Sequence, residues 1–189
     1  KHYASKIMRT DKAELFWMNH NSTCVSRGVR FEKTLEMADS ELMLALLPVT
    51  VPAFKDMRKH MATEREFEGL TSKGYAYEHV LGEIPTVHHL CLKRSKDVVY
   101  SDAGVTYTLP EALEYEWQAP GRCMTPIFSN VGQLKIVGFH VIGGSSAITG
   151  KGKPIGCAEP VVRESFIELD LGVHPISALS IQGYSDTEK

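Results

Sequence analysis

No apolar run in this 189-residue sequence approaches the roughly 20 residues that a membrane-spanning helix needs. Disulfide signatures are missing too, because the four cysteines Cys24, Cys91, Cys123 and Cys157 form no CxxC pair and no dense framework. They predict free thiols in a reducing compartment. The net charge is only −2, so binding to nucleic acid or to a membrane surface would need a local patch of charge.

What is present is the composition of an ordinary globular protein, with 43% hydrophobic and 23% charged residues, and enough length for one or two packed domains. Short apolar or alternating segments separated by turn residues predict a mostly β protein. Residues 110–117 fit either one helical turn or a strand with its glutamates outward. The segments predicted as strands are 13–18, 29–37, 41–47, 75–81, 85–93, 98–100, 105–109 and 135–142.

Residues 119–144, APGRCMTPIFSNVGQLKIVGFHVIGG, combine features that are ordinary when taken singly. Pro120-Gly121 predicts a tight turn that places Cys123 on a bend, and His140 lies in the strand that follows. A lone cysteine is usually a small buried apolar residue, and a lone strand histidine usually belongs to the core. A thiol on a bend whose backbone N–H groups can receive an oxyanion is also what a nucleophile requires. Gly121 permits the backbone angles of such a bend.

This segment resembles the nucleophile loop and substrate-pocket strand of the 3C-like cysteine proteases of picorna-like RNA viruses. Those motifs are Gly-x-Cys-Gly and Gly-x-His-x-Gly-Gly, and the matching residues here are Gly121-Arg122-Cys123 and the GFHVIGG run at 138–144. Met124 replaces the second loop glycine. The resemblance implies an all-β, chymotrypsin-like fold of two antiparallel β-barrels, the first truncated at its N-terminus. It also implies an endopeptidase that acts on viral polyprotein substrates in the host cell cytoplasm and cleaves after glutamine.

By the same resemblance, Cys123 is the nucleophile and His2 the general base. Glu41 is the first residue of the apolar segment 41–47, where the family has the acid that orients the base, and Asp39 is the alternative. No metal or organic cofactor is implied. The backbone N–H groups expected to hold the oxyanion belong to Gly121, Arg122 and Cys123.

His140, Gly143 and Gly144 match the part of the family motif that binds the substrate glutamine, the S1 pocket. An imidazole that donates to the glutamine carbonyl needs a fixed neutral tautomer, which Tyr107 or another hydroxyl would hold. Gly156-Cys157-Ala158 resembles the Gly-x-Ala strand that borders the family's cleft.

The resemblance also divides the chain. Residues 1–53 are expected to be the remainder of the N-terminal barrel, 54–70 a linker with a short helix, 71–175 the C-terminal barrel and 176–189 a tail. The chain begins with Lys1 rather than Met, which suggests a piece cut from a longer precursor. Gln182-Gly183 in the tail resembles the enzyme's own cleavage junction.

The linker FKDMRK resembles a Phe-Arg-Asp-Ile segment with an RNA-binding role in picornaviral members. Lys55, Arg58 and Lys59 could contact viral RNA, although three glutamates at 64, 66 and 68 dilute that charge. The alternative from another class is a non-catalytic RNA- or protein-binding β module. The oligomeric state stays open.

Histidines and a cysteine cluster in one further place, at His79, His88, His89 and Cys91. These residue types are zinc ligands. Adjacent strand residues point to opposite faces, so His88 and His89 do not readily share a metal, and no metal site is predicted.

Overall fold

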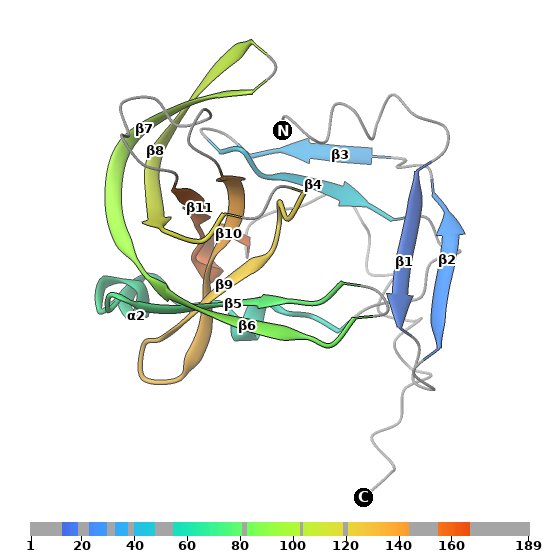
Figure 1. Cartoon of the computed structure of the whole chain (residues 1–189), viewed down its shortest axis with the longest axis horizontal. Coiled ribbons are helices and arrows are strands. Elements are labelled where there is room, and N and C mark those ends of the chain that lie inside the picture. Colours follow the sequence, from blue (N-terminus) through green and yellow to red (C-terminus); the bar gives the residue numbers. More distant parts are fainter. Residues whose placement is uncertain are drawn as a thin grey trace, which may run out of the picture. The chain divides into compact units, whose positions relative to one another are not determined.

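The computed structural model describes residues 13–18, 23–29, 33–37, 40–47, 55–80, 83–102, 104–118, 121–143 and 155–166. Most of them lie in strands, and α2 (Glu64–Glu68) is the one α-helix among them, so the all-β prediction is confirmed at that level. The chain divides into two compact units. The first contains strands β1 to β4, and the second contains β5 to β11 together with Ser40 and Glu41 (Figure 1).

The first unit contains two antiparallel hairpins. Strand β1 (Glu14–Met18) pairs with β2 (Cys24–Gly28), and β3 (Lys33–Glu36) pairs with β4 (Met43–Leu46). The sequence predicted strands at three of these places but missed β2. The reason is that Val25 is the only half-buried residue of β2 and the rest are exposed, so the strand has no alternation to detect.

The second unit is built on one antiparallel sheet of seven strands in the order β6-β5-β9-β10-β11-β8-β7. The edge strands β6 and β7 are joined by Leu92 alone, so the two ends of the sheet meet at this residue. Figure 1 shows the strands bending around a common interior. The bounds are β5 (Lys73–Glu78), β6 (Thr86–Cys91), β7 (Lys93–Asp102), β8 (Val105–Tyr115), β9 (Pro126–Asn130), β10 (Leu134–Gly143) and β11 (Gly156–Pro160).

Two buried clusters hold this sheet together. The first brings Leu90 and Leu92 from one edge against Leu113 of β8, near the other edge, which requires the sheet to curl. Helix α2 contributes Phe67 to it. Each fully buried large apolar side chain stabilises the fold by roughly 1.5–3 kcal/mol. The second cluster consists of Val98, Tyr100, Leu109, Ala112, Val141, Ile142, Ile155 and Cys157.

Residues 110–117, which the sequence left open between helix and strand, mostly continue β8 as far as Tyr115. Successive side chains face the two clusters, with Leu113 in the first and Ala112 in the second. Of the glutamates, Glu111 is exposed as expected for a strand, but Glu114 is buried. This strand supplies the phenol of Tyr115 to the candidate site.

In the linker predicted at 54–70, the residues that follow Met57 form a 3-10 turn, η1 (Arg58–His60). Phe54 lies outside the described residues. Met61 is extended and forms a bridge with Ile136 of β10, and the N–H of the next residue, Ala62, donates to the Ile136 carbonyl at 2.9 Å.

The α-helix α2 starts a few residues further on. Its N-cap residue Thr63 accepts a hydrogen bond from the Glu66 N–H at 3.2 Å, and the Glu66 carboxylate accepts from the Thr63 N–H at 2.8 Å. This capping box explains why so short a helix begins there.

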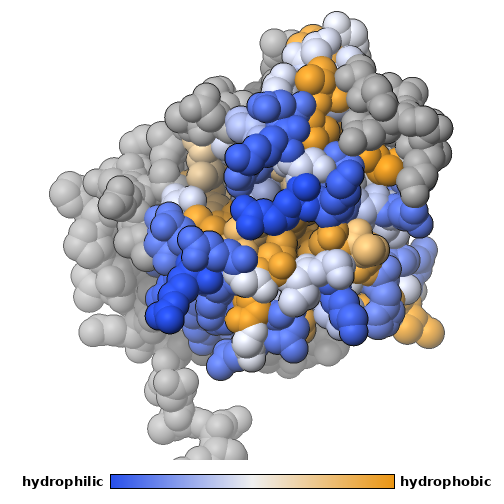
Figure 2. All heavy atoms as spheres, turned by 90° about the vertical axis from the view of Figure 1, so that its left-hand side faces the viewer, coloured by the Kyte–Doolittle hydropathy of each residue, from blue (hydrophilic) through white to orange (hydrophobic). Residues whose placement is uncertain are grey.

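Figure 2 views the second unit from the side of β7 and α2, where hydrophilic residues predominate and apolar residues are visible between them. Lys96 of β7 pairs in register with Glu111 of β8 and both are exposed, so charges of opposite sign are neighbours on this hairpin. The Arg94 guanidinium lies 5.0 Å from the centre of the Phe67 ring, where it covers part of the first cluster.

Candidate active site around the Cys123 turn

The bend predicted at Cys123 is present as a turn at the start of β9. Gly121 has φ +77°, a left-handed conformation that glycine adopts without steric cost, as the sequence predicted. The turn is closed by Thr125, whose N–H and hydroxyl donate to the Arg122 carbonyl at 3.1 and 2.8 Å. Cys123 therefore directly follows a left-handed glycine and a carbonyl that is held by two hydrogen bonds.

Met124 occupies the place of the second motif glycine and has φ +75°. For an L-residue this conformation is unfavourable by roughly 1–2 kcal/mol. A hydrogen bond from the Met124 N–H to the His140 carbonyl, 2.6 Å long, holds it there. The turn thus keeps glycine-like geometry, but this N–H is committed to His140 and is not a donor for an oxyanion.

The turn is fastened directly to strand β10. Besides the bond from Met124, the His140 N–H donates to the Thr125 carbonyl at 2.9 Å. The half-buried Cys123 thiol donates to the Val141 carbonyl at 3.4 Å. These three contacts bring the predicted nucleophile and the predicted pocket histidine into one small site.

His140 is 1% exposed, and its Nδ1 lies 2.6 Å from the Tyr115 hydroxyl. Burial raises the pKa of the Tyr115 phenol well above 10, with charge on Cys157 and Cys123 raising it further, so the phenol keeps its proton. A protonated phenol can donate or accept, and in the arrangement where the Tyr115 O–H donates to Nδ1 the imidazole proton lies on Nε2. Burial also lowers the pKa of His140 from 6.5 to about 4, so the ring is neutral at pH 7.

The sequence suggested Tyr107 or another hydroxyl for this role, and the partner is Tyr115. Tyr107 instead stacks on Tyr100, with ring centroids 5.1 Å apart. The half-buried Trp117 lies beside the imidazole, with its ring centroid 5.0 Å from that of His140. An aromatic wall therefore adjoins a neutral donor, which is suited to binding an uncharged polar group.

Gly138, in the same motif, is required by strand packing. A Cβ at this position would lie 2.8 Å from the Glu159 carbonyl oxygen of the neighbouring strand β11. Strand β10 is irregular on both sides of this residue, with register shifts between Ile136 and Gly138 and between His140 and Ile142. The close approach of β11 contributes to the burial of His140, which pairs in register with Ala158.

An ion-pair network that the sequence did not predict ties the turn to β5. The Arg122 Nε donates to Oε1 of Glu78, and His88 Nε2 lies 2.8 Å from Oε2 of the same carboxylate. The bond from Arg122 and then that with His88 hold the pKa of Glu78 below its usual range. Because 44 residues separate Arg122 from Glu78, no local pattern could have indicated this contact.

Glu41, the predicted acid, is half-buried beside β11. Its backbone N–H donates to Glu159 Oε2 at 2.8 Å, and the Ser40 hydroxyl donates to the other oxygen of that carboxylate. Burial raises the pKa of Glu159, while these two donors oppose the rise. Burial also raises the pKa of the Tyr100 phenol, and the Glu41 charge raises it further.

Several predicted residues lie outside the described part of the chain. They are the proposed base His2, the alternative acid Asp39, the pocket residue Gly144 and the Gln182-Gly183 junction. Gly143 is described and pairs with Gly156 at the end of β10. The assignments of base, acid and junction therefore stay predictions.

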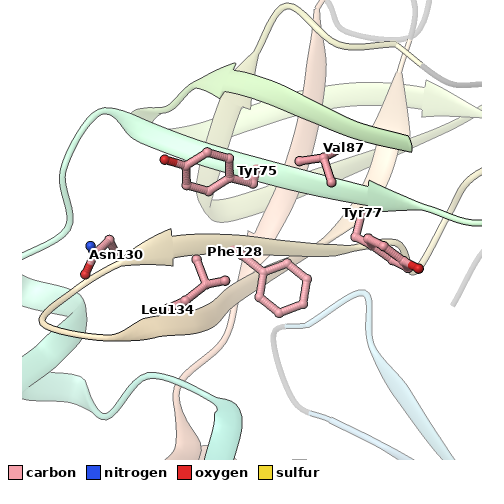
Figure 3. A pocket seen from close by; sticks show the side chains of 6 residues that line it. All are labelled: Tyr75, Tyr77, Val87, Phe128, Asn130 and Leu134. Atoms are coloured by element: carbon pink, nitrogen blue, oxygen red, sulfur yellow. The ribbon is translucent and has the colours of Figure 1, made fainter. Parts of the chain in front are cut away.

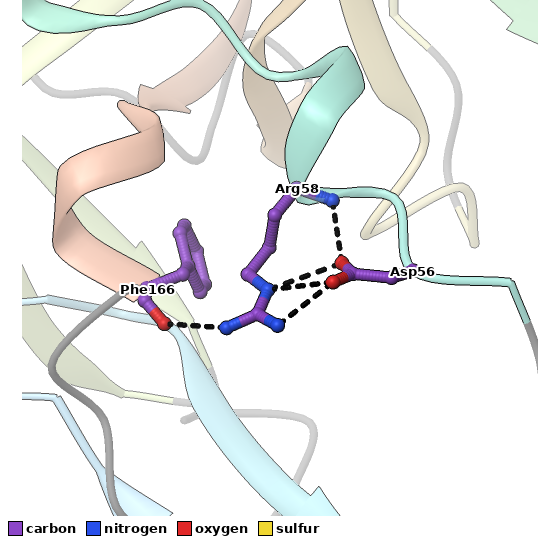
Figure 4. A network of polar contacts seen from close by, with 3 residues as sticks. All are labelled: Asp56, Arg58 and Phe166. Atoms are coloured by element: carbon purple, nitrogen blue, oxygen red, sulfur yellow. Dashed lines mark hydrogen bonds and ion pairs between the residues drawn. The ribbon is translucent and has the colours of Figure 1, made fainter. Parts of the chain in front are cut away.

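Of the predicted RNA-binding residues, Arg58 is engaged within the protein. Its guanidinium and backbone N–H both bond to Asp56, and a further nitrogen donates to the Phe166 carbonyl at 3.5 Å (Figure 4). The side-chain hydrogen bond from Arg58 lowers the pKa of Asp56 to about 2. Lys55 and Lys59 are exposed. The basic face is thus partly neutralised by its own carboxylate.

An apolar pocket of about 440 Å³ lies on the sheet away from the turn residues. Tyr75 and Tyr77 of β5, Val87 of β6 and residues of β9 and β10 line it (Figure 3). Its side chains include no carboxylate, imidazole or thiol, so it has no group suited to acid–base or nucleophilic chemistry.

Metal and membrane features are likewise assessed only for the described residues. Within them no three His, Cys, Asp or Glu side chains are placed to hold a metal ion. His88 and His89 do face opposite sides of β6, since His88 contacts Glu78 and His89 packs against Tyr75. No helix in this part of the chain has the length and apolar character to cross a membrane.

Comparison of the whole chain with protein-family models finds no match, and comparison with curated proteins finds no similar sequence. The functional argument therefore depends on the site itself.

Proposed function

We propose that this chain is a 3C-like cysteine endopeptidase that processes a viral polyprotein after glutamine. In this proposal the seven-stranded sheet is the C-terminal barrel of a chymotrypsin-like fold, and β1 to β4 belong to the N-terminal barrel. The curling that joins Leu90 and Leu113 in one cluster supports the first assignment. The family assignment itself comes from the Cys123 and His140 motifs.

The observation that carries the proposal is the attachment of the Cys123 turn to the backbone of His140. Two backbone hydrogen bonds and the thiol contact to Val141 connect the thiol to the strand of a neutral histidine whose Nδ1 is hydrogen-bonded to the Tyr115 hydroxyl. A structural cysteine needs neither a left-handed turn nor a buried tyrosine that orients a neighbouring imidazole. A nucleophile beside preorganised backbone donors and an oriented imidazole for the substrate glutamine would make use of both.

In the proposed reaction, His2 takes the Cys123 proton and the thiolate attacks the carbonyl carbon of the substrate glutamine. The oxyanion is held by N–H groups among Gly121, Arg122 and Cys123. Collapse of the intermediate breaks the peptide bond, and the imidazolium returns its proton to the departing amine. Water then hydrolyses the thioester, restoring the thiol. Glu41 orients His2, and this scheme involves no cofactor.

Selectivity follows from the state of His140. The Nε2–H would donate to the side-chain carbonyl oxygen of the substrate glutamine. Since the ring is neutral at pH 7, it offers no charge to attract a glutamate of the same size. A site built around one hydrogen bond to an amide discriminates by several orders of magnitude against groups that leave that donor unpaired.

The test uses the peptide ALSIQGYSDT, which reproduces residues 178–187, incubated with the full chain and analysed by mass spectrometry. Cleavage between Gln and Gly by the parent chain, absent with Cys123→Ala, is the expected result. Cys91→Ala is the matched control, because Cys91 is a free, exposed thiol on β6 and should not affect cleavage. Peptides with Glu or Asn in place of Gln test the pocket.

Equal cleavage by the parent and Cys123→Ala chains would show a contaminating activity and contradict the proposal. Absence of cleavage by the parent would favour the non-catalytic β module instead. Retention of an oligoribonucleotide by the chain, lost on replacing Lys55 and Lys59 together, would identify that module as RNA-binding.

A further inference from the structure

We propose that Glu78 is a positioning residue for the nucleophile turn, acting through the side chain of Arg122. The inference rests on the proposed function in that it assigns Glu78 to the same reaction. Glu78 comes from β5, the turn precedes β9, and a single carboxylate connects them. The sequence motifs contain Arg122 but give it no side-chain role.

The carboxylate uses both oxygens. Oε1 accepts from the Arg122 Nε, and Oε2 is bonded to His88 Nε2 at 2.8 Å. The three side chains are 19% exposed for Glu78, 38% for Arg122 and 30% for His88, so solvent screens this network less than a fully exposed pair. A carboxylate bonded on both oxygens has a defined orientation, which a positioning role requires.

Arg122 is held at two points. Its side chain is bound by Glu78, and its carbonyl accepts two hydrogen bonds from Thr125. The backbone between these points leads directly into Cys123. Fixing Arg122 therefore restricts the peptide group whose N–H belongs to Cys123, one of the proposed oxyanion donors.

The same network reaches the pocket histidine from the other side. The His88 ring lies 5.2 Å from that of Trp117, which in turn lies 5.0 Å from His140. Glu78 thus contacts one residue that adjoins the nucleophile and another that packs behind the pocket wall. An ion pair serving only surface solubility would touch neither.

The pair Asp56–Arg58 provides the comparison. It joins residues two apart in sequence, its side chains are 59% and 49% exposed, and neither bonds to the turn. Asp56→Asn therefore removes an ion pair from the same unit without removing a link to Cys123.

The experiment measures kcat and KM for the ALSIQGYSDT peptide with the full chain. For Glu78→Ala we expect kcat to fall roughly 10- to 100-fold, as for a slight misplacement of reacting groups, with KM changed less than about threefold. Glu78→Gln, which has the same shape, keeps the fold and should show a smaller loss. Asp56→Asn should keep both constants.

Action through Arg122 is tested by a double-mutant cycle. If Glu78 acts by holding Arg122, the chain carrying Glu78→Ala and Arg122→Ala should be no slower than Arg122→Ala alone. If the fall in kcat of the double variant equals the product of the falls in the two single variants, Glu78 acts elsewhere and the assignment is overturned.

A second readout does not depend on cleavage. The rate of Cys123 alkylation by iodoacetamide, resolved by peptide mass spectrometry, should change at least about threefold in Glu78→Ala and stay constant in Asp56→Asn. Cys91 in the same samples is the internal control. A response of Cys123 without peptide cleavage by the parent would refute the proposed function and keep the positioning role. Normal cleavage with an unchanged Cys123 rate and unchanged kcat in Glu78→Ala would refute the positioning role alone.

Discussion

Acidification provides a direct test of the buried histidine. In the unfolded chain a histidine titrates near 6.5, whereas burial lowers the pKa of folded His140 to about 4. Between these values the unfolded state binds a proton that the folded state does not. The neutral imidazole therefore contributes fully to stability above pH 6.5, and this contribution is lost as the pH falls toward 4.

The magnitude follows from the two pKa values. Moving from pH 7 to pH 4.5 should reduce the free energy of unfolding by about 2 kcal/mol through His140 alone, according to proton linkage. Other groups titrate in the same range. Because the pKa of Glu78 is lowered in the folded state, Glu78 adds to the loss of stability as the pH falls. The pKa of Glu159 is raised, so protonation of Glu159 opposes that loss. The parent chain by itself therefore cannot isolate the histidine.

The assay compares urea unfolding of the parent and of His140→Gln at both pH values. We expect the variant to be less stable at pH 7, because it disturbs a buried hydrogen bond. The difference in free energy of unfolding between the parent and the variant should become smaller by about 2 kcal/mol at pH 4.5. A ¹⁵N NMR titration of the imidazole should show Nε2 protonated and Nδ1 unprotonated down to about pH 5. An equal stability difference between parent and variant at both pH values, or an NMR titration midpoint of His140 near pH 6.5, would refute the reasoning.

Three further outcomes are expected. Tyr115→Phe should lower the free energy of unfolding by about 1–3 kcal/mol, because Nδ1 of His140 is left buried without its donor, and it should weaken discrimination between Gln and Glu peptides. Gly121→Ala should destabilise by about 1 kcal/mol in urea unfolding, since its φ of +77° is unfavourable for alanine although no atom blocks the new Cβ; an unchanged midpoint would contradict the turn geometry. Asp56→Asn should change stability by less than about 1 kcal/mol, because the pair with Arg58 is exposed, and a larger loss would show that this pair is structural.

The sequence predicted those strands whose apolar or alternating pattern indicates which residues are buried. The alternating and apolar segments around β1, β3, β4 and β10 are strands in the structure, as their local patterns predicted. Strand β2 and the segment around Met61 show what local pattern does not reveal. Strand β2 has almost no apolar alternation, and the bridge between Met61 and Ile136 joins residues that are distant in sequence.

The site divides in the same way. A glycine with positive φ can be predicted from the residues next to it, and Gly121 was. The partner of His140 could not be selected among the hydroxyls, because choosing Tyr115 over Tyr107 depends on where β8 passes β10 and β11 in the folded sheet. Glu78 was missed for the same reason: its role exists only when β5 and the turn before β9 are brought together.

Met124 shows that the backbone conformation at this position of the turn does not require glycine. A glycine after the proposed nucleophile would signal a left-handed backbone, yet here methionine adopts φ +75°. The bond from its N–H to the His140 carbonyl, together with the return bond from the His140 N–H to Thr125, stabilises that conformation by about 1 kcal/mol each, enough to offset the strain. The requirement is thus a turn hydrogen-bonded to the pocket strand, and glycine is one way of meeting it.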